Sequence, residues 1–217
     1  MEFDGVSIHW LGHDGFRIEA SGKTIYIDPY QLSKAQQNRN DADIIFVSHN
    51  HFDHLSMDDL KHVAGKSTTI VAAKECIQQL KSANATEVKG VCPGDILTIR
   101  DFPVEVIAAY NVSKKFHPKT DGKVGFVITV NNSRIYHIGD TDDIPEMSAT
   151  KPDIALVPVS GTYVMTAEEA AKATNEKIKP RKFAVPMHYG SIVGSDKDAS
   201  KFKQLVTACP VQILEKE

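Results

Sequence analysis

The run Ser48-His-Asn-His-Phe-Asp-His54 says most about how this chain folds, because three imidazoles and one carboxylate fall within a single short segment. It directly follows Ile44–Val47, a continuous apolar stretch that predicts a buried strand. Alternate side chains of an extended segment share one face, so His49 and His51 can bind one metal ion together. The run therefore predicts a metal site at the carboxyl end of a strand, where α/β proteins place their chemistry.

The second half of the run supplies a different pair of ligands. Asp53 and His54 lie where the chain must turn into the next helix, so they can swing toward a second ion. Imidazole and carboxylate suit zinc, iron or manganese far better than calcium or magnesium. The alternative is a polar loop that is merely rich in histidine, and the position after a buried strand favours the metal site.

Two further segments carry candidate ligands at strand ends. In Tyr136-His-Ile-Gly-Asp-Thr-Asp142, Asp140 follows Gly139, which permits a tight backbone turn, and its carboxylate could bridge two ions. In Pro186-Met-His-Tyr-Gly190, His188 could complete the shell of the second ion. Taken singly, Asp140 could be an ordinary turn residue and His188 a structural one. Three such strand ends in one chain make the joint case stronger than each part.

The remaining pattern predicts short strands mixed with helices. Further strands are expected at Val6–Trp10, Gly15–Ala20, Lys23–Ile27, Thr69–Ala72, Ile96–Ile99, Val104–Ala109, Gly125–Val130, Arg134–Ile138, Ile154–Val157, Phe183–Val185 and Val211–Leu214. Helices are expected from Ser56 to about Val63, over Lys74–Ala83, from Thr166 to about Lys177 and over Lys197–Ala208. Two packed sheets covered outside by helices is the natural layer arrangement for this α/β mixture, although pattern alone leaves a single mixed sheet open.

Length and charge narrow the class of protein. The 217 residues fit one domain spanning 1–217. The net charge of −3 gives no long-range attraction to nucleic acid or to an anionic membrane, so we expect neither as a partner. A small-molecule substrate fits this balance better, and a homo-oligomer remains compatible with it.

The cysteines, the first residues and the length of the apolar runs bear on the cellular compartment. The three cysteines, Cys76, Cys92 and Cys209, are far apart and form no C-x-x-C pair, so a disulfide framework is not expected. The first residues lack the basic and apolar regions of a signal peptide, and no apolar run approaches the ~20 residues of a membrane span. A reducing cytoplasm fits best.

These segments together resemble the metallo-β-lactamase superfamily. Its H-x-H-x-D-H motif stands complete from His49 to His54, Asp140 matches the bridging carboxylate and His188 the last metal histidine. Asp28, in Ile27-Asp-Pro29, resembles the early strand-end aspartate of that family. The resemblance implies a four-layer αβ/βα sandwich of two mixed sheets, with helices on the outer faces and the metals at one edge of the sheets.

Similarity extends beyond the ligands. The segments Trp10-Leu-Gly-His-Asp-Gly-Phe16, Val159-Ser-Gly-Thr-Tyr-Val-Met-Thr166 and Pro186–Gly190 look like the branch of small metal-dependent hydrolases that includes L-ascorbate-6-phosphate lactonase-like proteins. The resemblance thus covers nearly the whole chain.

One departure from the family pattern concerns the first metal. The superfamily usually supplies a third histidine just after the strand that here is Val104–Ala109, and this chain reads Ala109-Tyr-Asn111 at that place. The nearest histidine is His117, followed by Pro118. Either Asn111 or His117 is expected to substitute, and we favour His117. The alternatives are a surface histidine fixed by Pro118 and a first site with fewer protein ligands.

The resemblance leads to a predicted centre of two divalent ions, zinc first, with manganese or iron as alternatives. The first ion is assigned to His49, His51 and Asp140 and the second to Asp53, His54, Asp140 and His188. A hydroxide shared by the two ions would be the nucleophile, because bound water ionises near neutral pH. The candidate catalytic residues are Asp53 as a proton relay, Asp28 as a group that orients a ligand histidine, and His117; the candidate substrate-pocket residues are His13, Tyr163 and Tyr189.

Three functions are weighed against one another. A metal-dependent hydrolase of a small-molecule lactone, ester or phosphoester fits the size and charge best. A nuclease of the same superfamily would need an electropositive track, and none is visible. A non-hydrolytic metal-binding or redox scaffold is the third, and no electron-transfer domain accompanies this chain.

Overall fold

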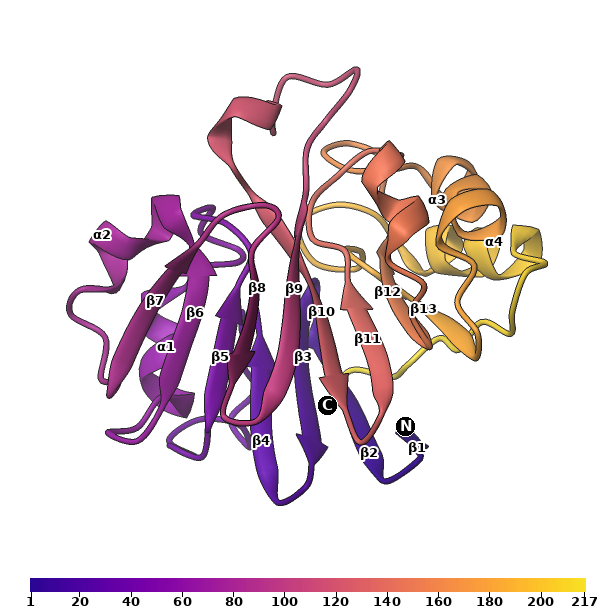
Figure 1. The fold of residues 1–217 in the computed structure, drawn as a ribbon. Helices are drawn as coiled ribbons and strands as arrows, with labels where there is room; N and C mark the ends of the chain where they lie inside the picture. Colours follow the sequence, from indigo (N-terminus) through magenta and orange to yellow (C-terminus); the bar gives the residue numbers. More distant parts are fainter.

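Two β-sheets packed face to face form the centre of the protein, whose computed structural model describes residues 1–217 (Figure 1). The first sheet follows chain order. Its strands are β1 (Glu2–Phe3), β2 (Val6–Gly12), β3 (Gly15–Ala20), β4 (Lys23–Ile27), β5 (Ile44–Val47), β6 (Thr69–Ala73) and β7 (Glu87–Val91). Strands β1 to β4 pair antiparallel, whereas β4 to β7 pair parallel.

The second sheet also has an antiparallel part and a parallel part. Its order is β13-β12-β11-β10-β9-β8. The strands are β8 (Ile96–Ile99), β9 (Phe102–Ala108), β10 (Val124–Val130), β11 (Ser133–His137), β12 (Ile154–Pro158) and β13 (Phe183–Met187). Strands β8 to β11 pair antiparallel and β11 to β13 parallel. Asn131 and Asn132 form the hairpin turn between β10 and β11, and both have positive φ.

Helices cover the two sheets from outside (Figure 1). Helices α1 (Met57–Val63) and α2 (Ile77–Leu80) lie beside the first sheet, and α3 (Ala167–Ala173) and α4 (Asp196–Leu205) beside β12 and β13. Ser56 caps α1, and Thr166 with Glu169 forms the capping box of α3, at the two helix starts that the sequence predicts. The four-layer sandwich is therefore confirmed.

Apolar side chains from both sheets meet in one core of 62 buried residues. The rings of Phe46 on β5 and Phe126 on β10 lie 4.9 Å apart between the sheets. All four residues of β5 are buried, so the strand is covered on both faces and its sequence is entirely apolar.

Several predicted elements differ from the structure. The expected strand Val211–Leu214 is wrong: only Val211 makes an isolated bridge, to Ala184. The expected helix Lys74–Ala83 is a 3₁₀ turn, Lys74–Cys76, followed by the short α2. Strand β7 was not expected, because its sequence Glu-Val-Lys-Gly-Val carries no apolar alternation. In the structure most of its residues are exposed.

Parallel pairing brings several strand ends to one edge of the sandwich. The chain leaves β5, β11 and β13 at their carboxyl ends, and each is followed by predicted ligands. Loops at this edge therefore position the candidate site. No helix is both long and apolar enough to cross a membrane.

Candidate metal centre

The loop after β5 directs its four polar side chains to two places. The backbone N–H groups of His54 and Leu55 both donate to the carbonyl oxygen of His51, at 3.0 and 2.8 Å, so the chain turns back sharply here. His49 and His51 stay together on one side, with Nε2 of His49 3.0 Å from Nδ1 of His51. His54 is fully buried, with its ring centroid 3.9 Å from that of His49 and its Nε2 facing Asp140.

A third imidazole completes the group around His49 and His51. Nε2 of His117 lies 3.4 Å from Nδ1 of His51, and the three side chains can offer ligand atoms within 4.8 Å of one another. We call His49, His51 and His117 the three-histidine cluster. His117 is nearly inaccessible to solvent, so it is not the surface histidine that the sequence left open.

Asn111 lies behind His117 and not among the ligands. Its Oδ1 accepts hydrogen bonds from the backbone N–H and the Nδ1 of His117, both at 3.1 Å. Its Nδ2 donates to Asp142 and to the carbonyl of Tyr163. The amide oxygen is thus occupied in orienting His117, which accounts for Asn111 better than the role of a substitute metal ligand.

Asp140 lies between the three-histidine cluster and a second group of side chains. Its Oδ2 is 3.4 Å from Nε2 of His117 and 3.3 Å from Nε2 of His188, and its Oδ1 is 3.5 Å from Nε2 of His54. Gly139 lets the chain deliver Asp140 here, because its φ is +71° and a Cβ would lie 2.8 Å from the Val124 carbonyl oxygen. One carboxylate therefore faces both groups of histidines.

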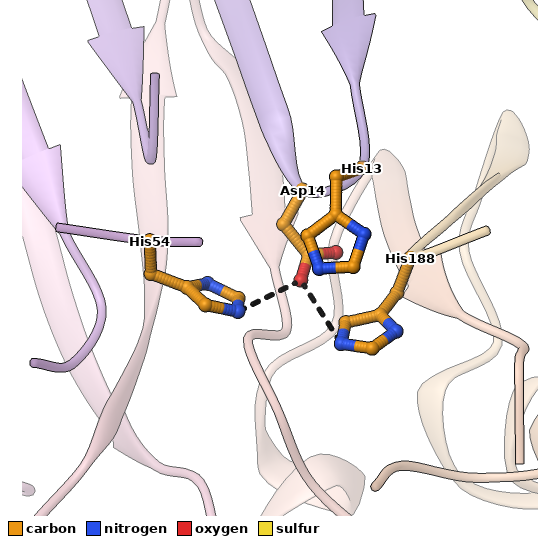
Figure 2. Close-up of side chains that lie close together, drawn as sticks. All are labelled: His13, Asp14, His54 and His188. Atoms are coloured by element: carbon orange, nitrogen blue, oxygen red, sulfur yellow. Dashed lines mark ion pairs between the residues drawn. The ribbon is translucent and has the colours of Figure 1, made fainter. Parts of the chain in front are cut away.

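The second group contains a residue that the sequence analysis missed. Asp14, in the turn between β2 and β3, is fully buried beside His54 and His188 (Figure 2). Its Oδ2 lies 3.5 Å from Nε2 of His54 and 3.8 Å from Nε2 of His188. Asp14 follows Gly12 and His13 in a segment that reads as an ordinary turn, and aspartate is common in turns, so the pattern gave no signal for a ligand.

Asp53 and His13 form a pair at the border of this group. Oδ2 of Asp53 lies 3.0 Å from Nε2 of His13 and 3.8 Å from Nε2 of His54. The His13 ring lies 4.1 Å from that of His188, and His13 is buried. His13 was predicted to line a substrate pocket, whereas the structure places it among the buried side chains that could hold a metal ion.

Four of the histidines are each held by a hydrogen-bonding partner at the ring nitrogen that points away from the centre. The pairs are His49 with Ser48 Oγ at 3.0 Å, His54 with Asp28 Oδ2 at 2.8 Å, His117 with Asn111 Oδ1 at 3.1 Å and His188 with Ser160 Oγ at 2.8 Å. Such partners fix the orientation of a metal-ligating imidazole. Asp28 is therefore positioned for its predicted role of orienting a ligand histidine, His54. Ser48 and Ser160 were missed, because serine at a loop carries no distinctive signal.

Buried polar atoms in the second group have no hydrogen-bond partner. They are both carboxylate oxygens of Asp14, Oδ1 of Asp140, Nε2 of His54, Nε2 of His188 and Nδ1 of His13. Unpaired buried polar atoms are rare because each costs about 1–3 kcal/mol. Nitrogen and carboxylate donors arranged in this way fit a divalent cation, which would satisfy them all at once.

The charges of the group also demand a cation. Burial alone would raise the pKa of Asp140, but His188 and His54 hold it well below its usual value. Burial alone would lower the pKa of His188, but Asp140 and Asp14 raise it to about 9. His54 and His188 are the two histidines of this group whose pKa is raised, whereas burial lowers the pKa of His13 and raises that of the Asp14 carboxyl well above its usual value.

A cavity of about 250 Å³ opens over the centre. It is lined by His51, Phe52, Asp53, Phe116, Asp140, Tyr163 and Ile192. Tyr163 therefore lies in the pocket that the sequence predicts for it, with its ring 4.6 Å from that of Phe116. Tyr189 does not: it is buried and stacks on Trp10 at 4.8 Å, so its aromatic ring fills the core instead of contacting substrate.

Comparison with known proteins agrees with this geometry. A family model described as a beta-lactamase superfamily domain matches residues 7–188. The chain belongs to the beta-lactamase superfamily. Its predicted membership in that superfamily is confirmed, and the protein is a metal-dependent hydrolase with a histidine- and aspartate-rich metal-binding cluster.

Individual members of the superfamily resemble the chain over almost its full length. A UPF0173 metal-dependent hydrolase from Thermococcus kodakarensis is 34% identical, over 93% of this chain and 92% of the relative. Another from Pelotomaculum thermopropionicum is 32% identical, over 96% of both chains. A crystal structure from Parabacteroides distasonis superposes with a TM-score of 0.83 at 29% identity, covering 98% of this chain and 94% of the other.

Proposed function

We propose that this member of the superfamily binds two divalent cations and hydrolyses a small-molecule carboxylic ester or lactone. The observation that supports two ions is the position of Asp140, whose carboxylate faces the three-histidine cluster through Oδ2 and His54 through Oδ1. Cations held by these histidines and carboxylates would let water ionise near neutral pH and would polarise the scissile carbonyl. Zinc is the first candidate, with manganese and iron as alternatives.

The lining of the cavity supports a substrate with an apolar group. Phe52, Phe116 and Ile192 surround the opening and remain partly exposed to solvent. No lysine or arginine is among the lining residues. Phosphoester sites rely on cationic side chains to bind the phosphate, so we place a carboxylic ester or lactone ahead of a phosphoester.

Asp53 is the candidate proton relay. It lines the cavity, and its Oδ2 lies 3.0 Å from Nε2 of His13. Burial alone would raise the pKa of Asp53, but the hydrogen bond with His13 lowers it, so the carboxylate is ionised and can accept a proton. A carboxylate held in this way can pass that proton to the leaving oxygen.

The state of the cysteines bears on the cellular compartment, because thiols stay unpaired in a reducing environment. All three cysteines are free, and Cys76 is buried. We propose that the protein works in the cytoplasm, with a small molecule and not a nucleic acid as its partner.

A substrate panel tests the function. The protein, loaded with Zn²⁺ or Mn²⁺, is assayed on p-nitrophenyl esters of increasing chain length, on lactones, on bis-p-nitrophenyl phosphate and on short RNA. We expect esters or lactones to be hydrolysed at least ~10-fold faster than the phosphodiester, with kcat/KM rising with chain length. The Asp140→Asn variant is the control and should be inactive. Hydrolysis of RNA alone would reject the proposal in favour of a nuclease.

A further inference from the structure

The carboxyl group of Asp14 is buried by the fold and has no hydrogen-bond partner. The side chain is fully buried, and neither Oδ1 nor Oδ2 has a hydrogen-bond partner. Its backbone is nevertheless fixed, because His137 Nε2 donates to the Asp14 carbonyl oxygen at 2.9 Å. A charged carboxylate without partners in a protein interior is costly, and burial accordingly raises the pKa of the Asp14 carboxyl well above its usual value. A bound cation would remove that cost.

Asp28, a second buried aspartate at the same edge, shows the contrast. Its carboxylate binds the backbone N–H and the hydroxyl of Ser48 and also Nδ1 of His54. Asp28 thus holds the ligand loop in place. Asp14 holds nothing in place, and a purely structural role does not account for it.

The neighbours of Asp14 are themselves unpaired nitrogen donors. Its Oδ2 lies 3.5 Å from Nε2 of His54 and 3.8 Å from Nε2 of His188, as Figure 2 shows. Both nitrogens lack hydrogen-bond partners. These separations are at or beyond the limit of a hydrogen bond. They are close to the ~3.3 Å that separates two ligands each ~2.0–2.1 Å from one ion in tetrahedral geometry.

We propose that Asp14 is a ligand of the cation held by His54 and His188, which rests on the proposed two-ion function. Together with Asp140, it gives this site two carboxylates beside the imidazoles of His54, His188 and His13, whereas the other site has three imidazoles and Asp140 as its one carboxylate. Added carboxylate donors favour Mn²⁺ relative to a site dominated by imidazole. The two positions therefore differ in metal preference, and Asp14 sets that difference.

The test compares Asp14→Asn with the wild type and with Asp153→Asn as a control. Asp153 is also buried, but its carboxylate accepts from the Arg134 backbone and from Arg181, far from the ligands. Each full-length protein is stripped of metal and titrated with Mn²⁺, with free Mn²⁺ followed by electron paramagnetic resonance, and bound Zn²⁺ is measured by elemental analysis. We expect Asp14→Asn to lose at least ~10-fold in Mn²⁺ affinity at one site and to retain one Zn²⁺.

Thermal unfolding separates a ligand from a structural residue. If Asp14 is a ligand, the metal-free Asp14→Asn variant unfolds at the same or a higher temperature than the metal-free wild type, because the carboxyl group makes no hydrogen bond that the substitution would remove. The increase in Tm on adding Mn²⁺ then shrinks. A lower Tm without metal together with an unchanged increase would overturn the proposal, as would wild-type stoichiometry and affinity.

The outcomes distinguish this proposal from the proposed function. Loss of Mn²⁺ binding in Asp14→Asn supports Asp14 as a ligand even if no ester is hydrolysed. If the wild type hydrolyses esters and metal binding by Asp14→Asn is unchanged, the assignment of Asp14 as a ligand is wrong and the proposed function stands. Asp14→Ser, which also removes the carboxylate, repeats the measurement if Asp14→Asn does not fold.

Discussion

Oδ2 of Asp28 lies 2.8 Å from Nδ1 of His54, and this hydrogen bond determines which ring nitrogen faces the metal centre. An ionised carboxylate can only accept, so Nδ1 of His54 carries the proton. Nε2 then points to Asp14 and Asp140, at 3.5 Å from each. The orientation of a ligand is thus fixed by a residue on a different strand end, 26 positions earlier in the chain.

Replacing Asp28 by Asn tests this relationship. The amide keeps one oxygen acceptor but presents an NH₂ group at the other position, so His54 or Ser48 loses its partner. We expect metal affinity at the His54 site to fall ~10–100-fold, as is typical when the group behind a ligand histidine is changed. Titration of the metal-free protein measures it, with Asp153→Asn as the matched control. Equal affinity in the two variants would refute the orienting role.

His51→Ala should remove metal without unfolding the protein. His51 lines the cavity and contributes Nδ1 to the three-histidine cluster, but it is not part of the apolar core. We expect elemental analysis to find one ion fewer and hydrolysis to be lost, with an unchanged circular dichroism spectrum. Unchanged metal stoichiometry in this variant would contradict the assignment of His51.

Metal affinity should rise with pH. The carboxylates of Asp140 and Asp14 outweigh burial and raise the pKa of His188 to about 9, so below that pH the ring is protonated in the metal-free protein. A ligand imidazole must be neutral, so binding displaces at least one proton. The apparent Kd should fall at least ~10-fold per pH unit below pH 9. Calorimetric titrations in buffers of different ionisation enthalpy count the protons, and a pH-independent Kd between pH 6 and 8 would exclude the displacement.

The sequence was sufficient for the parts of the centre that follow a repeating pattern. The apolar run of β5 and the alternate histidines after it predicted a strand end with ligands, and Gly139 marked the turn that delivers Asp140. Asp14 could not be found in this way, because its role depends on a turn of β2–β3 meeting the end of β13. Tyr189 was ambiguous for the same reason, since only the position of Trp10 shows that its ring packs in the core.

The interface between the two sheets should carry much of the stability. Phe126 is fully buried and its ring lies 4.9 Å from that of Phe46 in the opposite sheet. We expect Phe126→Ala to lower the free energy of unfolding by about 3–5 kcal/mol, because it leaves a cavity that the sheets cannot close. Urea denaturation measures this. Phe116→Ala is the control: its ring is half exposed at the cavity, so a loss as large as that of Phe126→Ala would contradict this reasoning.

The exposed ring of Phe52 should contribute to substrate binding and not to the stability of the fold. Phe52 is 66% exposed and lines the cavity, where an apolar substituent of the substrate would cover it. Losing that contact is worth about 1 kcal/mol, so we expect Phe52→Ala to raise KM for a long-chain ester about fivefold and leave kcat unchanged. Ile96→Ala, which removes another exposed apolar side chain on β8, should change neither. A fall in kcat with constant KM would instead place Phe52 in the chemistry, since only contacts made in the transition state lower kcat in this way.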